Sequence, residues 1–218
     1  MKPLVVSHGF TSGIESNLHT ALAFAGSGIA CLVFDFGGGS PLSLSQGKFE
    51  DVSVPTEVQD LESILDWVKE HYAFKDIFLL GSSMGGFVSA IVAAKNPDIK
   101  GLMLIFPAFV IPDDARAILG ISGSVSPDSP ALRENLKKEV LEAHASLNFE
   151  KAIQGYSGPV LLIHGDKDAI VPLSYSQKAK EIYKDARLLV YKDQGHGFDM
   201  KHKVLADDEC IGFVKAFS

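Results

Sequence analysis

A serine between two glycines is the residue of this sequence best suited to covalent chemistry. The segment Gly81–Gly85 reads Gly-Ser-Ser-Met-Gly and stands where an apolar run ends and a helical pattern begins. A serine hydroxyl is a weak nucleophile until its oxygen is held clear of the backbone beside a base. A sharp strand-to-helix turn holds it so, but the turn leaves room only for small residues two positions either side. Ser83 has glycine at both positions and Ser82 does not, so Ser83 is the predicted nucleophile; a glycine-serine turn without chemistry is the alternative.

Two aspartates after a later apolar run compete for the role of the acid. A carboxylate is needed to hold a base histidine in its working tautomer and to stabilise the imidazolium. Asp166 follows Gly165 in a tight turn, where an aspartate side chain most often bonds its own backbone. Asp168 lies further along the loop and can point toward a histidine. We therefore predict Asp168 as the acid.

The predicted base is His196, which lies between two glycines after the last apolar run. Flanking glycines let a loop place an imidazole in a cleft. Ser83, Asp168 and His196 follow in this order, each just beyond the carboxyl end of a different predicted strand, which is the edge where parallel sheets bind ligands. The other histidines that we weighed are interpreted either as surface or capping residues (His71, His144, His202) or as residues at strand ends that shape the site (His8, His164).

A loop after the first apolar run supplies a candidate oxyanion hole. A tetrahedral oxyanion needs preorganised N–H donors, and losing one typically costs about 2.7–4 kcal/mol of barrier. The Met84 amide would be one donor, at the positive end of its helix. The Phe10 amide would be the other, because Gly9 lets the backbone of that loop turn tightly.

No cofactor or metal is expected. No lysine follows the glycines around Ser83, so that segment is not a phosphate-binding loop. Gly37–Ser40 lacks the spacing of a dinucleotide fingerprint and is interpreted as a wide turn. No cluster of His, Cys, Asp and Glu has zinc-type spacing. Cys31 and Cys210 are interpreted as small core residues.

The elements that must position these residues alternate between apolar strands and amphipathic helices. Such alternation predicts a parallel, doubly wound sheet with right-handed crossovers. The fold class is thus α/β, with six mainly parallel strands flanked by helices in one domain over residues 1–218. The predicted strands are Leu4–Ser7, Ile29–Phe34, Asp76–Gly81, Gly101–Phe106, Pro159–His164 and Ala186–Tyr191. The predicted helices are Ser16–Ala25, Thr56–His71, Met84–Lys95, Tyr175–Tyr183 and Val204–Phe217.

Residues 107–157 interrupt the alternation with no strand pattern. An insertion of this length in a compact domain is usually functional, so we predict a helical lid; a packed helical excursion without a role in substrate choice is the alternative. Ser129 and Pro130 are typical of a helix start. Beyond them, one apolar helix face is predicted from Leu132, Leu136, Val140 and Leu141.

Composition excludes some classes of partner. The 218 residues carry a net charge of −7 and a pI of about 5.5, whereas nucleic-acid binding needs a basic patch. No apolar stretch is long enough for export or a membrane span. We therefore expect a cytoplasmic protein with a small-molecule substrate, although a leader could once have preceded a chain that opens inside a strand. The sequence leaves the oligomeric state open.

At these residues the chain resembles the α/β-hydrolase superfamily, and more narrowly the small bacterial cinnamoyl and feruloyl esterases. The serine motif and the loop after His164 carry the resemblance, together with His8–Thr11, Phe34–Gly37, Gly47–Asp51 and Glu57. It implies an acyl-enzyme mechanism with nucleophile Ser83, acid Asp168, base His196 and oxyanion donors Phe10 and Met84. The chain departs from those esterases at Gly38 and Ser82, where they usually have histidine, in the sequence of its insertion, and in lacking their leading antiparallel strands.

The sequence therefore predicts a serine hydrolase that cleaves carboxylic esters. An apolar stretch in the insertion suggests a short or aromatic, cinnamoyl-type acyl group (Phe109, Val110, Ile111, Ile118, Leu119). Ser82 before the nucleophile also occurs in thioesterase-like relatives, so a thioester or a small amide is an alternative substrate. A binding protein that has kept the fold and lost catalysis is a further alternative.

Overall fold

Six parallel strands form the centre of the computed structural model, which describes residues 3–40, 43, 45–73, 76–123 and 136–217. The sheet order is β2-β1-β3-β4-β5-β6, and every pairing between neighbours is parallel. The predicted strands are confirmed to within two residues at each end. The strands are β1 (Pro3–Ser7), β2 (Ala30–Val33), β3 (Ile77–Ser82), β4 (Ile99–Ile105), β5 (Val160–Gly165) and β6 (Ala186–Tyr191).

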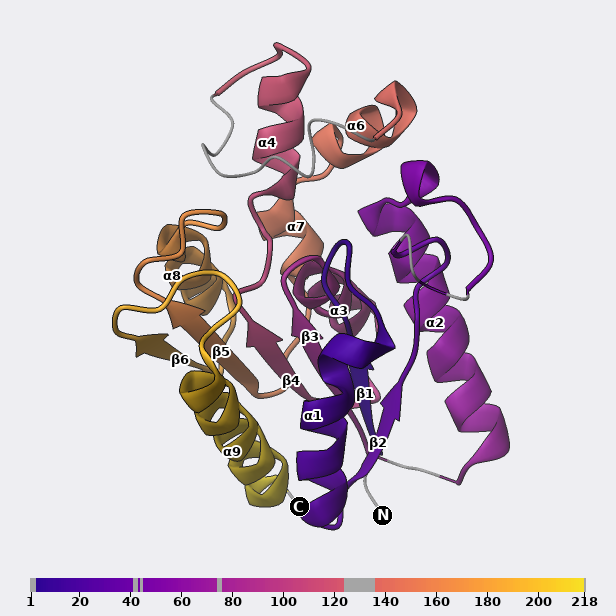
Figure 1. Cartoon of the computed structure of the whole chain (residues 1–218), viewed down its shortest axis with the longest axis vertical. Helices are drawn as coiled ribbons and strands as arrows, with labels where there is room; N and C mark the ends of the chain where they lie inside the picture. The colour runs from indigo at the N-terminus through magenta and orange to yellow at the C-terminus, as the bar shows by residue number, and fades with distance from the viewer. Residues whose placement is uncertain (1–2, 41–42, 44, 74–75, 124–135, 218) are drawn as a thin grey trace.

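Helices cover both faces of the sheet (Figure 1). On one face, α1 (Ile14–Gly26) and α9 (Met200–Ala216) pack against a core cluster that includes Phe24 and Phe213. On the other, α2 (Val54–His71), α3 (Met84–Lys95) and α8 (Leu173–Ile182) pack against a cluster that includes Phe87. This double cover explains why the central strands are continuously apolar rather than alternating.

The start of α2 is fixed by its own sequence. Ser53 accepts a hydrogen bond from the Thr56 N–H, and the Thr56 hydroxyl accepts one from the Ser53 N–H, which completes a capping box. The core-facing stripe of the helix contains Val58, Leu61 and a glutamate, Glu57, which is 1 % exposed. Neither carboxyl oxygen of Glu57 has a hydrogen-bond partner among the residues that the structure describes.

The described part of residues 107–157 forms helices and no strand, as predicted: α4 (Ile111–Ile118), α6 (Lys138–Ala145) and α7 (Phe149–Ile153). Figure 1 shows α4 and α6 beyond the end of the sheet to which the strands point. Val140 and Leu141 are buried and Leu136 is half-buried, whereas the predicted Ser129-Pro130 helix start and Leu132 lie outside the described residues. Phe109, Val110 and Ile111 belong to the core cluster under α3.

Side-chain hydrogen bonds join the insertion to the rest of the domain. Arg116 of α4 donates to the carbonyl oxygens of Ala145 and Leu147, which ties α4 to the end of α6. The Tyr175 hydroxyl of α8 donates to Asp113 of α4 at 2.6 Å. On the other side, Lys137 pairs with Glu50 and Asp51 in η1 (Phe49–Asp51), a short 3-10 helix before α2.

His144 of α6 also joins the insertion to α2. It is fully buried, and its Nε2 accepts a hydrogen bond from the Val54 N–H at 2.9 Å. The interpretation of His144 as a surface residue is therefore wrong, while the capping interpretation is correct. The first N–H groups of a helix have no acceptor within it, and a neighbouring helix supplies one here.

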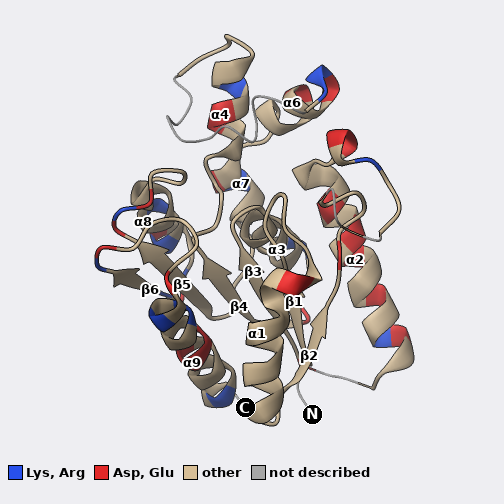
Figure 2. Cartoon of the chain, viewed as in Figure 1, with Lys and Arg blue, Asp and Glu red and all other residues tan. Residues whose placement is uncertain are grey.

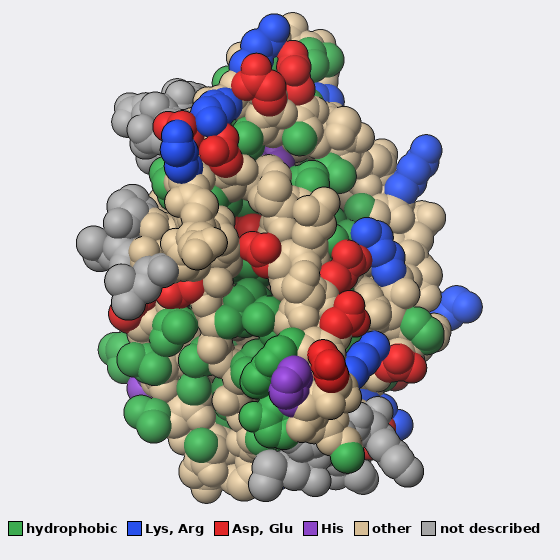
Figure 3. Space-filling model, turned by 90° about the vertical axis from the view of Figure 1, so that its right-hand side faces the viewer, with side chains coloured by type: hydrophobic (Ala, Val, Ile, Leu, Met, Phe, Trp, Pro, Cys, Tyr) green, Lys and Arg blue, Asp and Glu red, His purple; other side chains and the backbone are tan. Residues whose placement is uncertain are grey.

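Charges of both signs are interspersed over the described surface. Figure 2 shows Lys and Arg among Asp and Glu on α2 and α9, while α1 is almost uncharged. On the α2 side of the molecule, hydrophobic, acidic and basic side chains alternate without one dominant charge (Figure 3). Cys31 and Cys210 are free thiols. None of the described helices is long and apolar enough to cross a membrane.

Candidate active site

The turn between β3 and α3 presents Ser83 at the end of the sheet. Ser83 has φ 54° and ψ −122°, a region that costs a non-glycine residue about 1–3 kcal/mol. A Cβ at Gly81 would lie less than 3.0 Å from the Gly85 carbonyl oxygen, and a Cβ at Gly85 less than 3.0 Å from the His8 carbonyl oxygen. Both glycines are thus required by close approach, which is the requirement that selected Ser83 from the sequence.

Backbone hydrogen bonds hold this strained residue in place. The Ser83 N–H donates to the Ile105 carbonyl oxygen of β4 at 3.0 Å. The Ser83 carbonyl oxygen accepts from the N–H groups of Gly86 at 3.0 Å and Ala108 at 2.8 Å. Because partners on both sides fix its peptide groups, the nucleophile candidate is preorganised by the sheet rather than by its own side chain.

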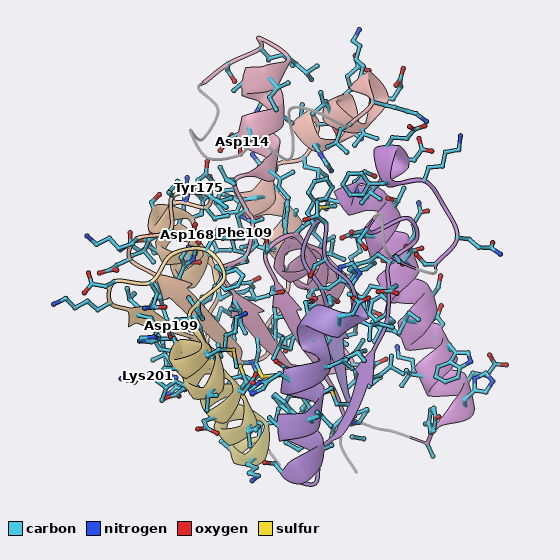
Figure 4. All side chains as sticks on the ribbon, viewed as in Figure 1. Phe109, Asp114, Asp168, Tyr175, Asp199 and Lys201 are labelled. Atoms are coloured by element: carbon cyan, nitrogen blue, oxygen red, sulfur yellow. The ribbon has the colours of Figure 1, made fainter. Side chains whose placement is uncertain are left out.

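His196 joins Ser83 to Asp168. Its Nε2 lies 2.9 Å from Ser83 Oγ, and its Nδ1 lies 2.8 Å from Asp168 Oδ2. The structure therefore brings the three side chains predicted from the sequence into one hydrogen-bonded chain, although 113 residues separate Ser83 from His196. Figure 4 shows Asp168 at the end of the sheet to which the strands point.

The Asp168 carboxylate is buried and fully hydrogen-bonded. Its Oδ1 accepts from the N–H groups of Ile170 at 3.0 Å and Val171 at 2.8 Å. The buried His164 lies 3.3 Å from its Oδ2. Burial alone would raise the pKa of Asp168, but hydrogen bonds from His164 and His196 outweigh it and leave the pKa lowered. Asp168 therefore stays ionised, as a group that must stabilise an imidazolium needs to be.

The Asp166 side chain bonds a neighbouring loop, so the expectation that it would bond its own backbone was wrong. Its Oδ1 accepts from the Asp193 N–H at 2.6 Å, in the loop that carries the base candidate. The Lys167 N–H donates to the Gln194 carbonyl oxygen at 2.8 Å in the same loop. A Cβ at Gly165 would collide with Gln194. The loops after β5 and β6 are thus bound to each other directly.

The loop after β1 packs against the nucleophile candidate. A Cβ at Gly9 would be 3.0 Å from Ser83 Cβ, so glycine permits the approach of the Phe10 segment. Met84 opens α3, and the N–H groups of a first helical turn have no acceptor within the helix. The two predicted donors thus lie in segments that flank Ser83.

His8 fixes the position of the loop after β1 through contacts in the interior of the protein. It is fully buried, its Nδ1 lies 2.9 Å from the Gly9 carbonyl oxygen, and its Nε2 accepts from the Phe36 N–H at 3.1 Å. Burial lowers the pKa of His8, so it is neutral and can accept that bond. Asp35 accepts from the Ile14 N–H at 2.8 Å and so holds the start of α1. The sequence suggested that His8 shapes the site, but gave no role for Asp35.

Phe106 is a site residue that sequence reasoning missed. Its ring lies 4.6 Å from the His196 ring and 5.0 Å from Phe198, measured between ring centroids. Its φ of 36° is positive. The available signal was an aromatic residue directly after β4, at the same edge as the three loops already selected.

The described residues contain no group of three or more His, Cys, Asp or Glu that could hold a metal ion. The Gly37 N–H donates to Asp60 at 2.8 Å, and Gly39 leaves room for the His8 ring, because a Cβ there would lie 2.9 Å from His8 Cε1. These glycines pack beneath the site, in agreement with their interpretation as a structural turn.

Comparison with known proteins places this geometry in a family. The family model described as "Serine aminopeptidase, S33" matches residues 2–146, and one described as "TAP-like protein" matches residues 142–215. The solved structure of Est1E from Butyrivibrio proteoclasticus with bound ferulic acid is 27% identical, with a TM-score of 0.84 over 99% of this chain and 88% of that one.

Two curated relatives show similar identity. The dihydrolipoyllysine-residue acetyltransferase component of the acetoin cleaving system of Pseudomonas putida is 25% identical over 98% of this chain. The mouse serine hydrolase BPHL is 27% identical over 66% of this chain. The chain spans 63% and 56% of the lengths of these two relatives.

Proposed function

The chain belongs to the S33 serine aminopeptidase family of α/β-hydrolases, and we propose that it hydrolyses carboxylic esters through an acyl-enzyme on Ser83. The observation that carries the proposal is the hydrogen-bonded chain from Ser83 Oγ to His196 at 2.9 Å and from His196 to Asp168 at 2.8 Å. That arrangement of nucleophile, base and acid is the one by which serine hydrolases activate a hydroxyl.

In the first half-reaction, Ser83 Oγ attacks the ester carbonyl carbon while His196 Nε2 takes its proton. Asp168 holds Nδ1 in its protonated tautomer and stabilises the imidazolium. The carbonyl oxygen becomes an oxyanion, to which the Phe10 and Met84 N–H groups donate. His196 then gives its proton to the alcohol oxygen, the bond from the carbonyl carbon to that oxygen breaks, and the acyl group remains on Ser83.

In the second half-reaction, a water molecule takes the place of the alcohol. His196 accepts one proton of the water as its oxygen attacks the acyl carbon. The bond to Ser83 Oγ breaks and His196 returns the proton to it, which releases the carboxylic acid. The ionised state of Asp168, favoured by its lowered pKa, supports both proton transfers.

The acyl group is proposed to be short or aromatic. Residues 107–157 act in this proposal as a lid whose described helices α4 and α6 stand beyond the sheet end that carries Ser83. Aromatic rings pack in and beside the insertion: the partly buried Phe10 packs on Phe49, and the buried Phe149 packs on both Phe109 and Tyr175. The similar Est1E structure holds ferulic acid, which is an aromatic acid.

The direct test is turnover of p-nitrophenyl butyrate and p-nitrophenyl ferulate by purified protein. Wild type is expected to release p-nitrophenol and Ser83→Ala to lose this activity by about 10⁶-fold, the size of loss known when such a nucleophile is removed. Ser63→Ala, an exposed serine on α2, is the matched control and should keep full activity. Equal turnover by Ser83→Ala and wild type would refute the proposal.

An amide or thioester substrate is the second candidate, because the matching family model is described as an aminopeptidase. The same nucleophile and base would serve, so a panel of aryl esters, acyl thioesters and aminoacyl amides with matched acyl groups separates the classes by kcat/KM. A non-catalytic binding protein is tested by a fluorophosphonate probe. Failure of the probe to label Ser83 in folded protein would favour that alternative.

A further inference from the structure

A cavity of about 320 Å³ adjoins the site on the α1 and α9 side of the sheet. Ser83 and His196 form one end of it, and Leu80, Ile105 and Phe106 form an apolar wall. Residues from the first two turns of α1 and of α9 also line the cavity, and most of them are polar, among them Asn17, Thr20 and Asp207. The cavity therefore offers a small substrate an apolar face and a hydrogen-bonding face.

Asn17 of α1 is unusual among these polar residues. It is 7% exposed, and its Nδ2 has no hydrogen-bond partner among the described residues. An amide N–H that is buried without an acceptor costs about 1–3 kcal/mol. A ligand oxygen in the cavity that Asn17 lines would remove this cost.

Asp207 of α9 lines the same cavity and is 3% exposed. Its Oδ1 accepts from the Thr20 hydroxyl at 2.8 Å and its Oδ2 lies 2.9 Å from His19 Nδ1. Two partners fix the carboxylate, and each of its oxygens can accept a further bond. Asn17 and Asp207 thus place an amide donor and a carboxylate acceptor among the residues that line one cavity, the pair that a hydroxyl group satisfies.

The mechanism decides which part of an ester would enter. His196 must pass its proton to the alcohol oxygen, so the alcohol lies beside the His196 ring. This cavity is lined by His196 and by the residues that follow it, Gly197, Phe198 and Met200. No described residue of the insertion lines this cavity, so the side of the site toward α4 and α6 is left for the acyl group.

We propose that the α1–α9 cavity binds the alcohol part of the ester and that Asn17, with Asp207, selects alcohols that carry a free hydroxyl group. The inference rests on the proposed ester hydrolysis and names its leaving group. Asn17 is then a specificity-determining residue that takes no part in the bond changes.

Glyceryl 1-monobutyrate and propyl butyrate test this directly, because they share the acyl group and the three-carbon alcohol chain and differ in two hydroxyls. Both give the same acyl-enzyme, so the ratio of their kcat/KM values reports recognition of the alcohol together with the intrinsic difference between the two leaving groups, and that intrinsic difference cancels when the ratios of wild type and variants are compared. Wild type is expected to prefer the glyceryl ester by at least about tenfold, as expected for one well-formed hydrogen bond.

Asn17→Leu is expected to reduce that ratio to about one, and its cooperative thermal unfolding, compared with that of wild type, shows that the variant folds. Thr20→Val, which removes one partner of Asp207 without changing its shape, should lower the ratio less. Leu22→Ala, 73% exposed on the same helix, is the control and should keep the wild-type ratio.

The outcomes separate the two proposals. A wild-type ratio near one, or an equal loss on both esters in Asn17→Leu and Thr20→Val, overturns the selection of hydroxylated alcohols and leaves ester hydrolysis standing. Absence of Ser83-dependent cleavage of both esters overturns the hydrolysis itself and this assignment with it.

Discussion

Replacing His144 by glutamine should remove a large part of the acid sensitivity of the fold. The His144 ring is fully buried and accepts a hydrogen bond from the Val54 N–H through Nε2. Protonation would charge a buried ring and turn this acceptor into a donor that faces another donor. Burial lowers the pKa of His144 from 6.5 to about 4.

The sign and size of the effect follow from linkage. Below pH 6.5 the unfolded chain binds a proton at this residue that the folded protein does not bind until about pH 4. Stability is therefore lost as the pH falls through this window. A difference of about 2.5 pKa units at about 1.36 kcal/mol each gives roughly 3 kcal/mol, a large share of a domain's typical 5–15 kcal/mol.

Urea unfolding at several pH values between 7.5 and 4 measures this. Between these limits, wild type should lose about 3 kcal/mol more of its free energy of unfolding than His144→Gln. Glutamine keeps an acceptor near the Nε2 position and does not titrate, and other titrating groups cancel in the difference. His71→Gln, an exposed histidine on α2, controls for the substitution. Parallel pH curves for wild type and His144→Gln would refute the assignment.

Three further predictions concern the candidate acid, a buried glutamate and the turn that carries Ser83. Asp168→Asn should lower kcat by roughly 10⁴-fold, whereas Asp166→Ala, measured in the same ester assay, should cost less than about tenfold in kcat and about 1 kcal/mol in urea unfolding. Burial raises the pKa of Glu57 well above 4.5, so the unfolded chain ionises at this residue before the folded protein does, and wild type loses stability as the pH rises. Glu57→Gln does not titrate, so its free energy of unfolding should exceed that of wild type by up to about 1.4 kcal/mol per pH unit above 4.5, seen as a growing difference in Tm. Gly81→Ala should abolish fluorophosphonate labelling of Ser83. The control Gly212→Ala, with open space around its Cβ in α9, should stabilise the folded protein by about 0.5–1 kcal/mol. Labelling of Gly81→Ala at the wild-type rate would contradict the close-approach argument.

The regular elements could be predicted because burial imposes a clear pattern on them. Strands covered on both faces are continuously apolar, and helices between them show one apolar stripe, so both were located within a few residues. The short helices α4 and α7 were not predicted, because segments of eight and five residues hold too few apolar positions to reveal a helical period in the sequence. Phe149 of α7 packs on Phe109 in the core cluster that includes Phe87. The Asn148 cap of α7, which accepts from Lys151 N–H, was the signal that was missed.

The candidate site divides in the same way. Ser83 was selected as the candidate nucleophile by a steric requirement that acts within a few residues, and Asp168 and His196 were selected as candidate acid and base by their place after parallel strands. Phe106 and the pair Asn17 and Asp207 depend on contacts between segments far apart in the chain, and no local pattern marks them. The wrong interpretation of Asp166 has this cause too, since its partner is in the loop after β6.

The hydrogen bonds of the candidate site imply that His196 and Asp168 are held together more firmly than either is held to Ser83. Asp166 and the Lys167 N–H each bond the loop that carries His196, and Asp168 bonds its ring. One hydrogen bond from the His196 ring reaches Ser83. Ser83 is fixed separately, by β4 and by the residues after it. A shift of the two loops would therefore open the distance between His196 and Ser83 while the pair of His196 and Asp168 stayed intact. In the proposed mechanism the working tautomer depends on that pair, so His196 would keep the proton on its Nδ1 through such a motion, and only its contact with Ser83 would have to re-form before attack.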